Sequence, residues 1–203
     1  MKISNCVQGT DEWFQEKLGK PSASNINKII SSTGKPSKQR EGYLYQLAAE
    51  RITGKRDDTF KNEAMEEGNA REQESRDLVS LITGHDIEQV GVVYKDEDKR
   101  FLCSPDGLVN DREYGLELKN VLGKTQVKYL LGGKVPTDYV IQIQSSLYIS
   151  GLPFWLFCAY SPGLSPLILK VERDEALIHK IGVELDKFCD ELDEVEKKVR
   201  GKK

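Results

Sequence analysis

The residues best suited to chemistry in this sequence are two carboxylates and a lysine near its centre. Leu116-Glu117-Leu118-Lys119 alternates apolar and charged residues with the period of a β-strand, so Glu117 and Lys119 are expected on one face. Upstream, Ser104-Pro105-Asp106-Gly107 places a carboxylate in a tight turn, and a hairpin step of 11 residues leads from Asp106 to Glu117. Asp106 and Glu117 can therefore converge on one cation, with Lys119 beside them. For an isolated Leu-Glu-Leu-Lys segment, a half-exposed strand with a polar outer face is the simpler alternative.

Carboxylates, rather than histidines or cysteines, are the metal ligands that the sequence offers. Its two histidines, His85 and His179, are far apart, and its four cysteines are scattered with no Cys-x-x-Cys pair. This pattern argues against a zinc ribbon, a disulfide scaffold or an iron–sulfur cluster. Carboxylate oxygens prefer hard cations, so we expect Mg²⁺, with Mn²⁺ possible as the alternative. The ion would lower the pKa of a bound water, and Lys119 would position that water or stabilise developing negative charge.

Charge is distributed unevenly along the 203 residues. The net charge is −3, but residues 1–56 carry ten Lys and Arg against five acids, and the remainder of the chain is strongly acidic. A basic amino-terminal part beside an acidic body suits a protein that holds phosphate on one side and metal on another, although plain solvated surface is the alternative. The sequence has no phosphate loop, no secretory signal and no run long enough to span a membrane, so a cytoplasmic location is expected.

Helical and extended patterns follow one another along the chain. Helical spacing predicts helices over residues 43–53, 62–83 and 137–148, ended by Gly54, Gly84 and Gly151, and a C-terminal helix capped by Asp174 whose apolar seam should pack on the domain. Strands are expected at residues 87–94, 100–104, 108–109 and 116–121, which form an antiparallel meander, and at 154–160 and 167–171. Residues 31–40 form a loop. Residues 140–144 also alternate like a strand, and the sequence leaves that alternative open.

Pro105-Asp106 followed by Glu117-Leu118-Lys119 resembles the PD-(D/E)XK nuclease pattern. The longer strings around these residues are similar to the phage λ exonuclease, or YqaJ-type viral recombinase, family. Further blocks at residues 13–24, 68–76, 131–133 and 142–144 also resemble that family, so the resemblance covers most of the chain. It implies one α/β domain over residues 1–203, of the restriction-endonuclease-like class, with a mixed central sheet flanked by helices.

The resemblance also suggests roles for residues around the central three. Glu72 would be a third carboxylate ligand, direct or through water, and the Leu118 carbonyl would add another ligand. Gln142 would orient the nucleophilic water. Asp96 and Ser104 would support the metal ligands from further out. The simpler alternatives are a surface salt bridge for Glu72 and a helix-surface amide for Gln142.

A second set of residues would bind the DNA end. Lys17 lies where the family often has an arginine that receives a terminal 5′-phosphate, and lysine lacks the planar two-point grip of arginine on phosphate. Ser22 and Ser24 would add hydrogen bonds, although Ser22-Ala23-Ser24 also fits a helix N-cap, and both roles can hold. Further candidate DNA contacts lie in and after the loop, namely Lys35, Lys38 and Arg40.

The activity implied by the resemblance is Mg²⁺-dependent 5′→3′ exonuclease digestion of linear double-stranded DNA, which leaves 3′ single strands for annealing recombination. A ring-shaped homotrimer, a single-strand annealing protein as partner and a phage or prophage origin are implied in the same way. Three alternatives remain: an endonuclease or a nuclease of other polarity, a DNA-binding module without catalysis, and an acidic domain whose polar strand face has no function.

Overall fold

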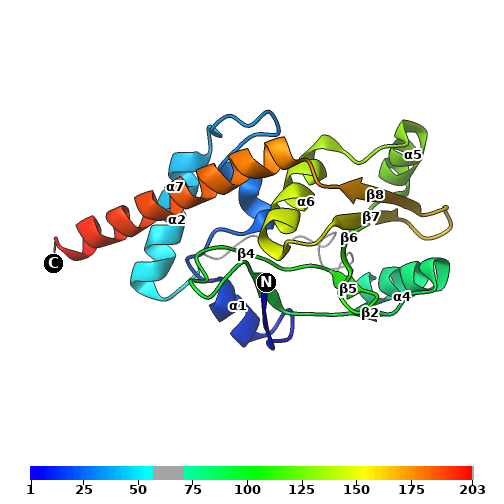
Figure 1. Cartoon of the computed structure of the whole chain (residues 1–203), viewed down its shortest axis with the longest axis horizontal. Coiled ribbons are helices and arrows are strands. Elements are labelled where there is room, and N and C mark those ends of the chain that lie inside the picture. Colours follow the sequence, from blue (N-terminus) through cyan, green and yellow to red (C-terminus); the bar gives the residue numbers. More distant parts are fainter. Residues whose placement is uncertain (57–70, 203) are drawn as a thin grey trace.

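The fold is built on two β-sheets that helices cover (Figure 1). The computed structural model describes residues 1–56 and 71–202. The strands are β1 (Lys2–Ser4), β2 (Ile87–Glu88), β3 (Val92–Tyr94), β4 (Leu102–Cys103), β5 (Gly107–Val109), β6 (Tyr114–Asn120), β7 (Phe154–Tyr160) and β8 (Leu167–Glu172). The helices are α1 (Asp11–Lys17), the 3-10 helix η1 (Ala23–Lys28), α2 (Arg40–Thr53), α4 (Glu72–Thr83), α5 (Gly123–Gly132), α6 (Thr137–Ser150) and α7 (Glu175–Arg200).

The larger sheet has five strands in the order β2-β5-β6-β7-β8, and the smaller has three in the order β1-β3-β4. Within the larger sheet β6 and β7 are parallel, and the other neighbours are antiparallel. Parallel neighbours need a long crossover, which α5 and α6 provide. The expected mixed sheet flanked by helices is therefore confirmed.

Strand β6 has two different faces, as its alternation predicts. Leu116 and Leu118 pack in an apolar cluster with Val79 of α4. Glu117 and Lys119 point to the opposite face, toward α6. Because helices cover both faces, Glu117 is only 3% exposed. A strand with a solvated polar outer face is thus excluded.

The predicted antiparallel meander over residues 87–121 is wrong as a single sheet, although its antiparallel pairs β3–β4 and β5–β6 are present. The expected strand 87–94 is two strands, β2 and β3, which belong to different sheets. The break lies at Gly91, where a Cβ atom would come within 2.1 Å of the Cys6 carbonyl oxygen. The Gly91 carbonyl accepts hydrogen bonds from Ser104 Oγ (2.6 Å) and Trp13 Nε1 (3.2 Å), so the chain here bonds to other segments and leaves the larger sheet. Strand β4 of the smaller sheet then leads directly into the turn that contains Asp106.

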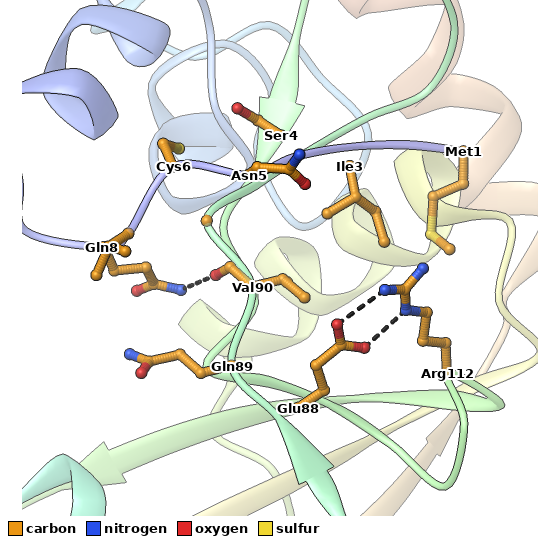
Figure 2. A pocket seen from close by; sticks show the side chains of 12 residues that line it. Met1, Ile3, Ser4, Asn5, Cys6, Gln8, Glu88, Gln89, Val90 and Arg112 are labelled. Atoms are coloured by element: carbon orange, nitrogen blue, oxygen red, sulfur yellow. Dashed lines mark hydrogen bonds and ion pairs between the residues drawn. The ribbon is translucent and has the colours of Figure 1, made fainter.

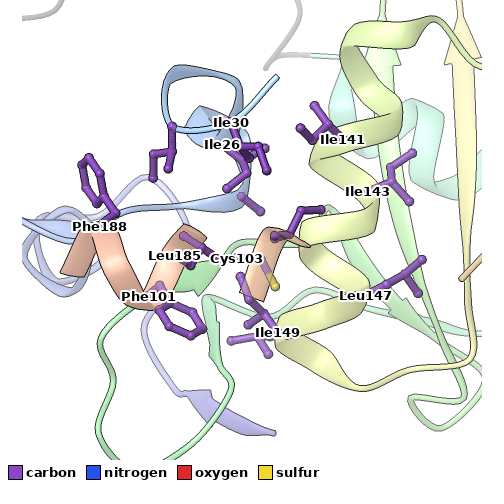
Figure 3. Packing of buried hydrophobic residues seen from close by; sticks show 14 of the residues in the cluster. Ile26, Ile30, Phe101, Cys103, Ile141, Ile143, Leu147, Ile149, Leu185 and Phe188 are labelled. Carbon is purple, nitrogen blue, oxygen red and sulfur yellow. The ribbon is translucent and has the colours of Figure 1, made fainter. Parts of the chain in front are cut away.

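Most predicted helices are confirmed. Helix α6 begins at Thr137 and ends before Gly151, which excludes a strand at residues 140–144. Asp174 caps α7, since its Oδ1 accepts from the Leu177 N–H at 3.0 Å. The apolar seam of α7 packs on the domain against α2, as expected, and Figure 3 shows Leu185 and Phe188 in the core. Residues 62–70 of the expected second helix lie outside the described residues, and its described part is α4. Helix α5 and strand β1 were not predicted.

One core joins α6, α7, η1 and β4 (Figure 3). Its members include Ile26, Ile30, Phe101, Cys103, Ile141, Ile143, Leu147 and Ile149, all under 5% exposed. Burial raises the pKa of the Cys103 thiol to about 12, consistent with its place in the core. This core fixes α6 against the face of β6 on which Glu117 lies. Among the described residues, no helix combines the length and apolarity needed to cross a membrane.

We expect Gly115→Ala to destabilise the fold. A Cβ atom at Gly115 would lie 2.3 Å from the Trp155 ring, which is fully buried, so the sheet would have to shift. Overpacking of this kind costs about 1–3 kcal/mol in the free energy of unfolding. Gly42→Ala is the matched control, because Gly42 lies in α2 with nothing near its would-be Cβ and should gain about 0.5–1 kcal/mol. Urea unfolding monitored by circular dichroism measures both; a neutral Gly115→Ala would contradict the packing argument.

Candidate active site

The Asp106 side chain is fixed against β6 by backbone hydrogen bonds. The Asp106 N–H donates to the Leu116 carbonyl at 3.1 Å, which closes the turn after β4. In the other direction, the Leu118 N–H donates to Asp106 Oδ2 at 2.6 Å. A residue that precedes the hairpin is in this way placed beside the middle of β6.

Glu117 lies between a lysine and a glutamine. Its Oε1 accepts from Gln142 Nε2 of α6 at 2.6 Å and pairs with Lys119 Nζ at 2.5 Å. Lys119 Nζ also lies 5.1 Å from the centroid of the Tyr139 ring, at the start of α6. The structure therefore brings Asp106, Glu117, Lys119 and Gln142 together.

The charges in this cluster influence each other strongly. Burial, and then the negative charge of Glu117, raises the pKa of Asp106 to about 8, although Lys119 opposes the shift. Burial alone would lower the pKa of Lys119, but the Glu117 and Asp106 carboxylates outweigh it and the pKa rises. Lys119 is thus held as an ammonium ion, which suits charge stabilisation and not a role as a general base.

The two carboxylates fit a hard cation. In the described part of the chain, their hydrogen bonds fall on Oε1 of Glu117 and Oδ2 of Asp106, which leaves the other oxygen of each for an ion. A cation there would also offset the repulsion that raises the pKa of Asp106. Among the described residues no group of three or more His, Cys, Asp or Glu is arranged around one metal position. Two carboxylates with water are sufficient for Mg²⁺, which keeps several waters in most protein sites.

Glu72, the expected third ligand, is the first residue of α4 and forms an ion pair with Arg76. It is close enough to Asp106 to contribute to the raised pKa of that residue. The structure therefore contains the salt bridge that was the simpler alternative for Glu72. This salt bridge lies near Asp106 and Glu117.

Arg76 is a residue of this site that the sequence interpretation missed. It is 5% exposed, its Nε donates to the Asp106 carbonyl at 3.0 Å, and its Nη1 donates to Gln73 Oε1 at 2.7 Å. Together with the Glu72 ion pair, these bonds connect the first turn of α4 to the turn of Asp106. The signal in the sequence was the spacing of four residues between Glu72 and Arg76, which places them on one helix face.

The amino-terminal segment holds the same turn from another side. Gln8 Nε2 donates to the Pro105 carbonyl at 2.8 Å, and Trp13 Nε1 donates to Ser104 Oγ at 3.0 Å. Ser104 therefore supports the turn through hydrogen bonds, in line with its expected outer position. A cavity of about 510 Å³ lies between this segment and β2, bordered by the paired Glu88 and Arg112 (Figure 2).

Lys17 reaches toward the carboxylates from the end of α1. Its Nζ lies 3.7 Å from the centroid of the Trp13 ring. Burial, with the nearby Arg56, lowers the pKa of Lys17 to about 8, and the Asp106 charge opposes this shift. Ser22 is buried and shares a hydrogen bond with the exposed Ser24 at 3.1 Å, and its side chain caps nothing in η1.

Two candidate DNA contacts, Lys35 and Lys38, are exposed on the loop before α2, and no contact within the described chain connects them to the carboxylates. Arg40 is not available for DNA. Its Nη1 pairs with Glu191 of α7, and its guanidinium lies over the Phe188 ring at 5.1 Å. The ion pair and the ring contact hold Arg40 against α7, so it serves as a link between α2 and α7.

Asp96 does not support the metal ligands. It is exposed in the β3–β4 turn, where its Oδ1 accepts from the Asp98 N–H at 3.2 Å. Because β3 and β4 are antiparallel, this turn lies at the opposite end of the pair from Ser104. This acidic segment is an ordinary exposed turn between β3 and β4.

We expect Asp106→Asn to stabilise the metal-free protein increasingly as the pH rises. Since the folded pKa is about 8 and the unfolded value about 4, the folded wild type loses stability across this range, whereas asparagine does not titrate. The difference in Tm should be small near pH 4, grow toward pH 8 and then level off. Thermal unfolding in EDTA measures it, with the exposed Asp186→Asn of α7 as control. A pH-independent difference would contradict the burial of a repelled carboxylate.

Comparisons with known proteins agree with this architecture. The YqaJ-like viral recombinase domain matches residues 12–153. No curated protein sequence matches the chain. The crystal structure of the alkaline exonuclease LHK-Exo from Laribacter hongkongensis has a TM-score of 0.86 and 29% identity, covering 95% of this chain and 97% of that one. Its complex with dAMP gives a TM-score of 0.85 at 29% identity, with the same coverage.

A more distant structure shares the fold. The phage-related exonuclease from Haemophilus somnus 129PT has a TM-score of 0.67 and 15% identity, covering 89% of this chain and 96% of that one. At this identity the likeness concerns the fold alone. The family match extends from α1 through β6 to the end of α6 and so includes the Asp106–Glu117–Lys119 cluster. The chain belongs to the YqaJ-like viral recombinase domain family.

Proposed function

We propose that this protein is a divalent-metal-dependent deoxyribonuclease that digests linear double-stranded DNA from the 5′ end and leaves 3′ single strands. The observation that carries the proposal is the cluster of Asp106, Glu117, Lys119 and Gln142, in which Glu117 is buried and the other three are half-buried. Membership of the YqaJ-like family and likeness to structures described as exonucleases, one of them with dAMP, support it.

Asp106 and Glu117 would hold Mg²⁺ or Mn²⁺, with the Leu118 carbonyl as a further ligand and Glu72 reached through water. When bound, the ion lowers the pKa of a water molecule and neutralises negative charge on the phosphate. Lys119, whose pKa the two carboxylates raise in the metal-free site, would stabilise the negative charge that develops on the phosphate oxygens. Gln142 donates to the Glu117 carboxylate and would orient the attacking water.

Lys17 supports the proposed polarity. It belongs to the amino-terminal segment that also holds Ser104 and Pro105, and it lies within electrostatic reach of Asp106. A 5′-phosphate bound at Lys17 would place the DNA end at a fixed separation from the carboxylates. The family further supports a homotrimer around DNA and cooperation with a single-strand annealing protein as parts of the proposal.

The activity is tested with linear duplex labelled at either the 5′ or the 3′ end. With Mg²⁺ we expect nucleotides to be released first from the 5′-labelled strand, and EDTA to abolish release. Asp106→Asn, Glu117→Gln and Lys119→Met should each reduce the rate by at least about 100-fold, because each removes charge or a metal ligand at the reacting phosphate. Glu194→Gln, at an exposed position of α7, is the control. Rapid cutting of closed circular DNA would favour an endonuclease instead.

Substitution of Lys17 tests end recognition. We expect Lys17→Ala to reduce the preference for a 5′-phosphorylated over a 5′-hydroxyl end by roughly 10- to 100-fold, the value of one charge-assisted hydrogen bond. Lys17→Arg should retain or increase the preference, since arginine binds phosphate at two points. The control is Lys187→Ala, at an exposed position of α7. The two substrates are compared by initial rates; equal effects of Lys17→Ala on both would argue that Lys17 does not bind the end.

A further inference from the structure

Helix α5 has one face held by the fold and one without a partner in the described chain. On the held face Gln126 is fully buried, and its Nε2 donates to the carbonyls of Ala159 (3.0 Å) and Ser165 (2.8 Å). These bonds fix the rotation of the helix. The opposite face presents an exposed stripe at spacings of three and four residues, made of Lys124, Val127, Lys128 and Leu131.

The stripe exposes two large apolar side chains to solvent. Leu131 is 85% exposed and Val127 is 45% exposed. Residues 118–137 contain four lysines and no acid, in a chain whose net charge is −3. Of the described residues, none forms an ion pair with Lys124, Lys128 or Lys134, which follows the stripe. Since the fourth lysine, Lys119, is paired with Glu117, these three carry the unpaired positive charge of the stripe and the residues after it.

Helix α5, which carries the stripe, lies close to the candidate active site. It begins shortly after β6 ends at Asn120. On its inner side Tyr129 packs on the core and interacts with Tyr139, whose ring centroid lies 5.1 Å from Lys119 Nζ. Figure 1 shows α5 at the end of the molecule away from the C-terminus, with its outer side not covered by another element. A polyanion in the active site would have this helix beside it.

We propose that the α5 stripe, with Lys134, binds the phosphate backbone of the DNA substrate next to the nucleotides being cleaved. This inference rests on the proposed nuclease function. The lysines match phosphate in charge, and Val127 and Leu131 lie between them where sugar rings would contact the helix. A second copy fits less well, because a ten-residue helix offers little of the roughly 800 Å² per partner in a stable interface.

The test measures how DNA binding depends on salt, without catalysis. Binding of a labelled linear duplex in EDTA is followed by fluorescence anisotropy over a series of KCl concentrations, for the wild type and for Lys124→Gln/Lys128→Gln/Lys134→Gln. Each lost phosphate contact reduces the slope of log K against log[KCl] by about 0.9, so we expect a reduction of about 2 to 3 and a Kd at least about 10-fold higher. The matched control is Lys187→Gln/Lys197→Gln/Lys202→Gln, which removes the same charge from exposed positions elsewhere.

The outcomes separate this inference from the function on which it rests. If the wild type neither binds nor digests DNA, the proposed function fails. If the wild type does both and the two triple variants have equal slopes and affinities, the α5 assignment fails while the nuclease proposal stands. Sedimentation velocity adds a further check: a changed oligomeric state with unchanged DNA affinity would show that a second copy covers the stripe. A folded triple variant, verified by its wild-type Tm, makes each result interpretable.

Discussion

The structure depends on holding two carboxyl groups close together beside the middle of the larger sheet. Glu117 is buried and Asp106 is half-buried, and an ionised carboxylate in such a place costs up to several kcal/mol unless it is paired or hydrogen-bonded. The chain offsets part of this cost with the Lys119 ammonium, the Gln142 amide and the Leu118 N–H. The repulsion between the two carboxylates that remains raises the pKa of Asp106. A divalent cation bound between them would relieve this repulsion.

Two carboxylates that repel each other stay close together only if the surrounding structure holds them in place. Several segments of the chain make the hydrogen bonds that do so. The turn that contains Asp106 is hydrogen-bonded to the Leu116 carbonyl of β6 and to the Arg76 side chain of α4. Gln8 of the amino-terminal segment donates a hydrogen bond to the Pro105 carbonyl of the same turn. These contacts connect three regions that are far apart in sequence. Because the frame is made of backbone carbonyls and buried side chains, a metal would meet ligands already in position.

The distribution of charge around the pair explains how an acidic protein could act on a polyanion. Lys17 approaches the carboxylates from α1, and the lysines of α5 follow from the end of β6. Some arginines are neutralised by acids of the same chain, as Arg40 is by Glu191 and Arg76 is by Glu72. Net charge therefore says little here; what matters is which cations stay unpaired near the site.

The sequence by itself determined the features that depend on neighbours along the chain. The period of two in β6 separated Leu116 and Leu118 from Glu117 and Lys119, and the cap at Asp174 began α7. The family pattern also identified the carboxylate pair. Local geometry encodes such features, because backbone dihedrals and side-chain direction repeat within a few residues.

Only the tertiary structure decided the contacts between distant segments. The extended segment over residues 87–94 is interrupted at Gly91, because the Cys6 backbone occupies the space beside this glycine. Nothing near residue 91 in the sequence indicates this contact. Arg40 and Arg76 look alike as basic helix residues, yet one is held by α7 and the other holds Asp106. The family resemblance suggested that Asp96 lies near the site, but Asp96 lies in the β3–β4 turn, at the opposite end of the hairpin from Ser104. Partners brought together by folding, at separations of up to 151 residues, set these roles.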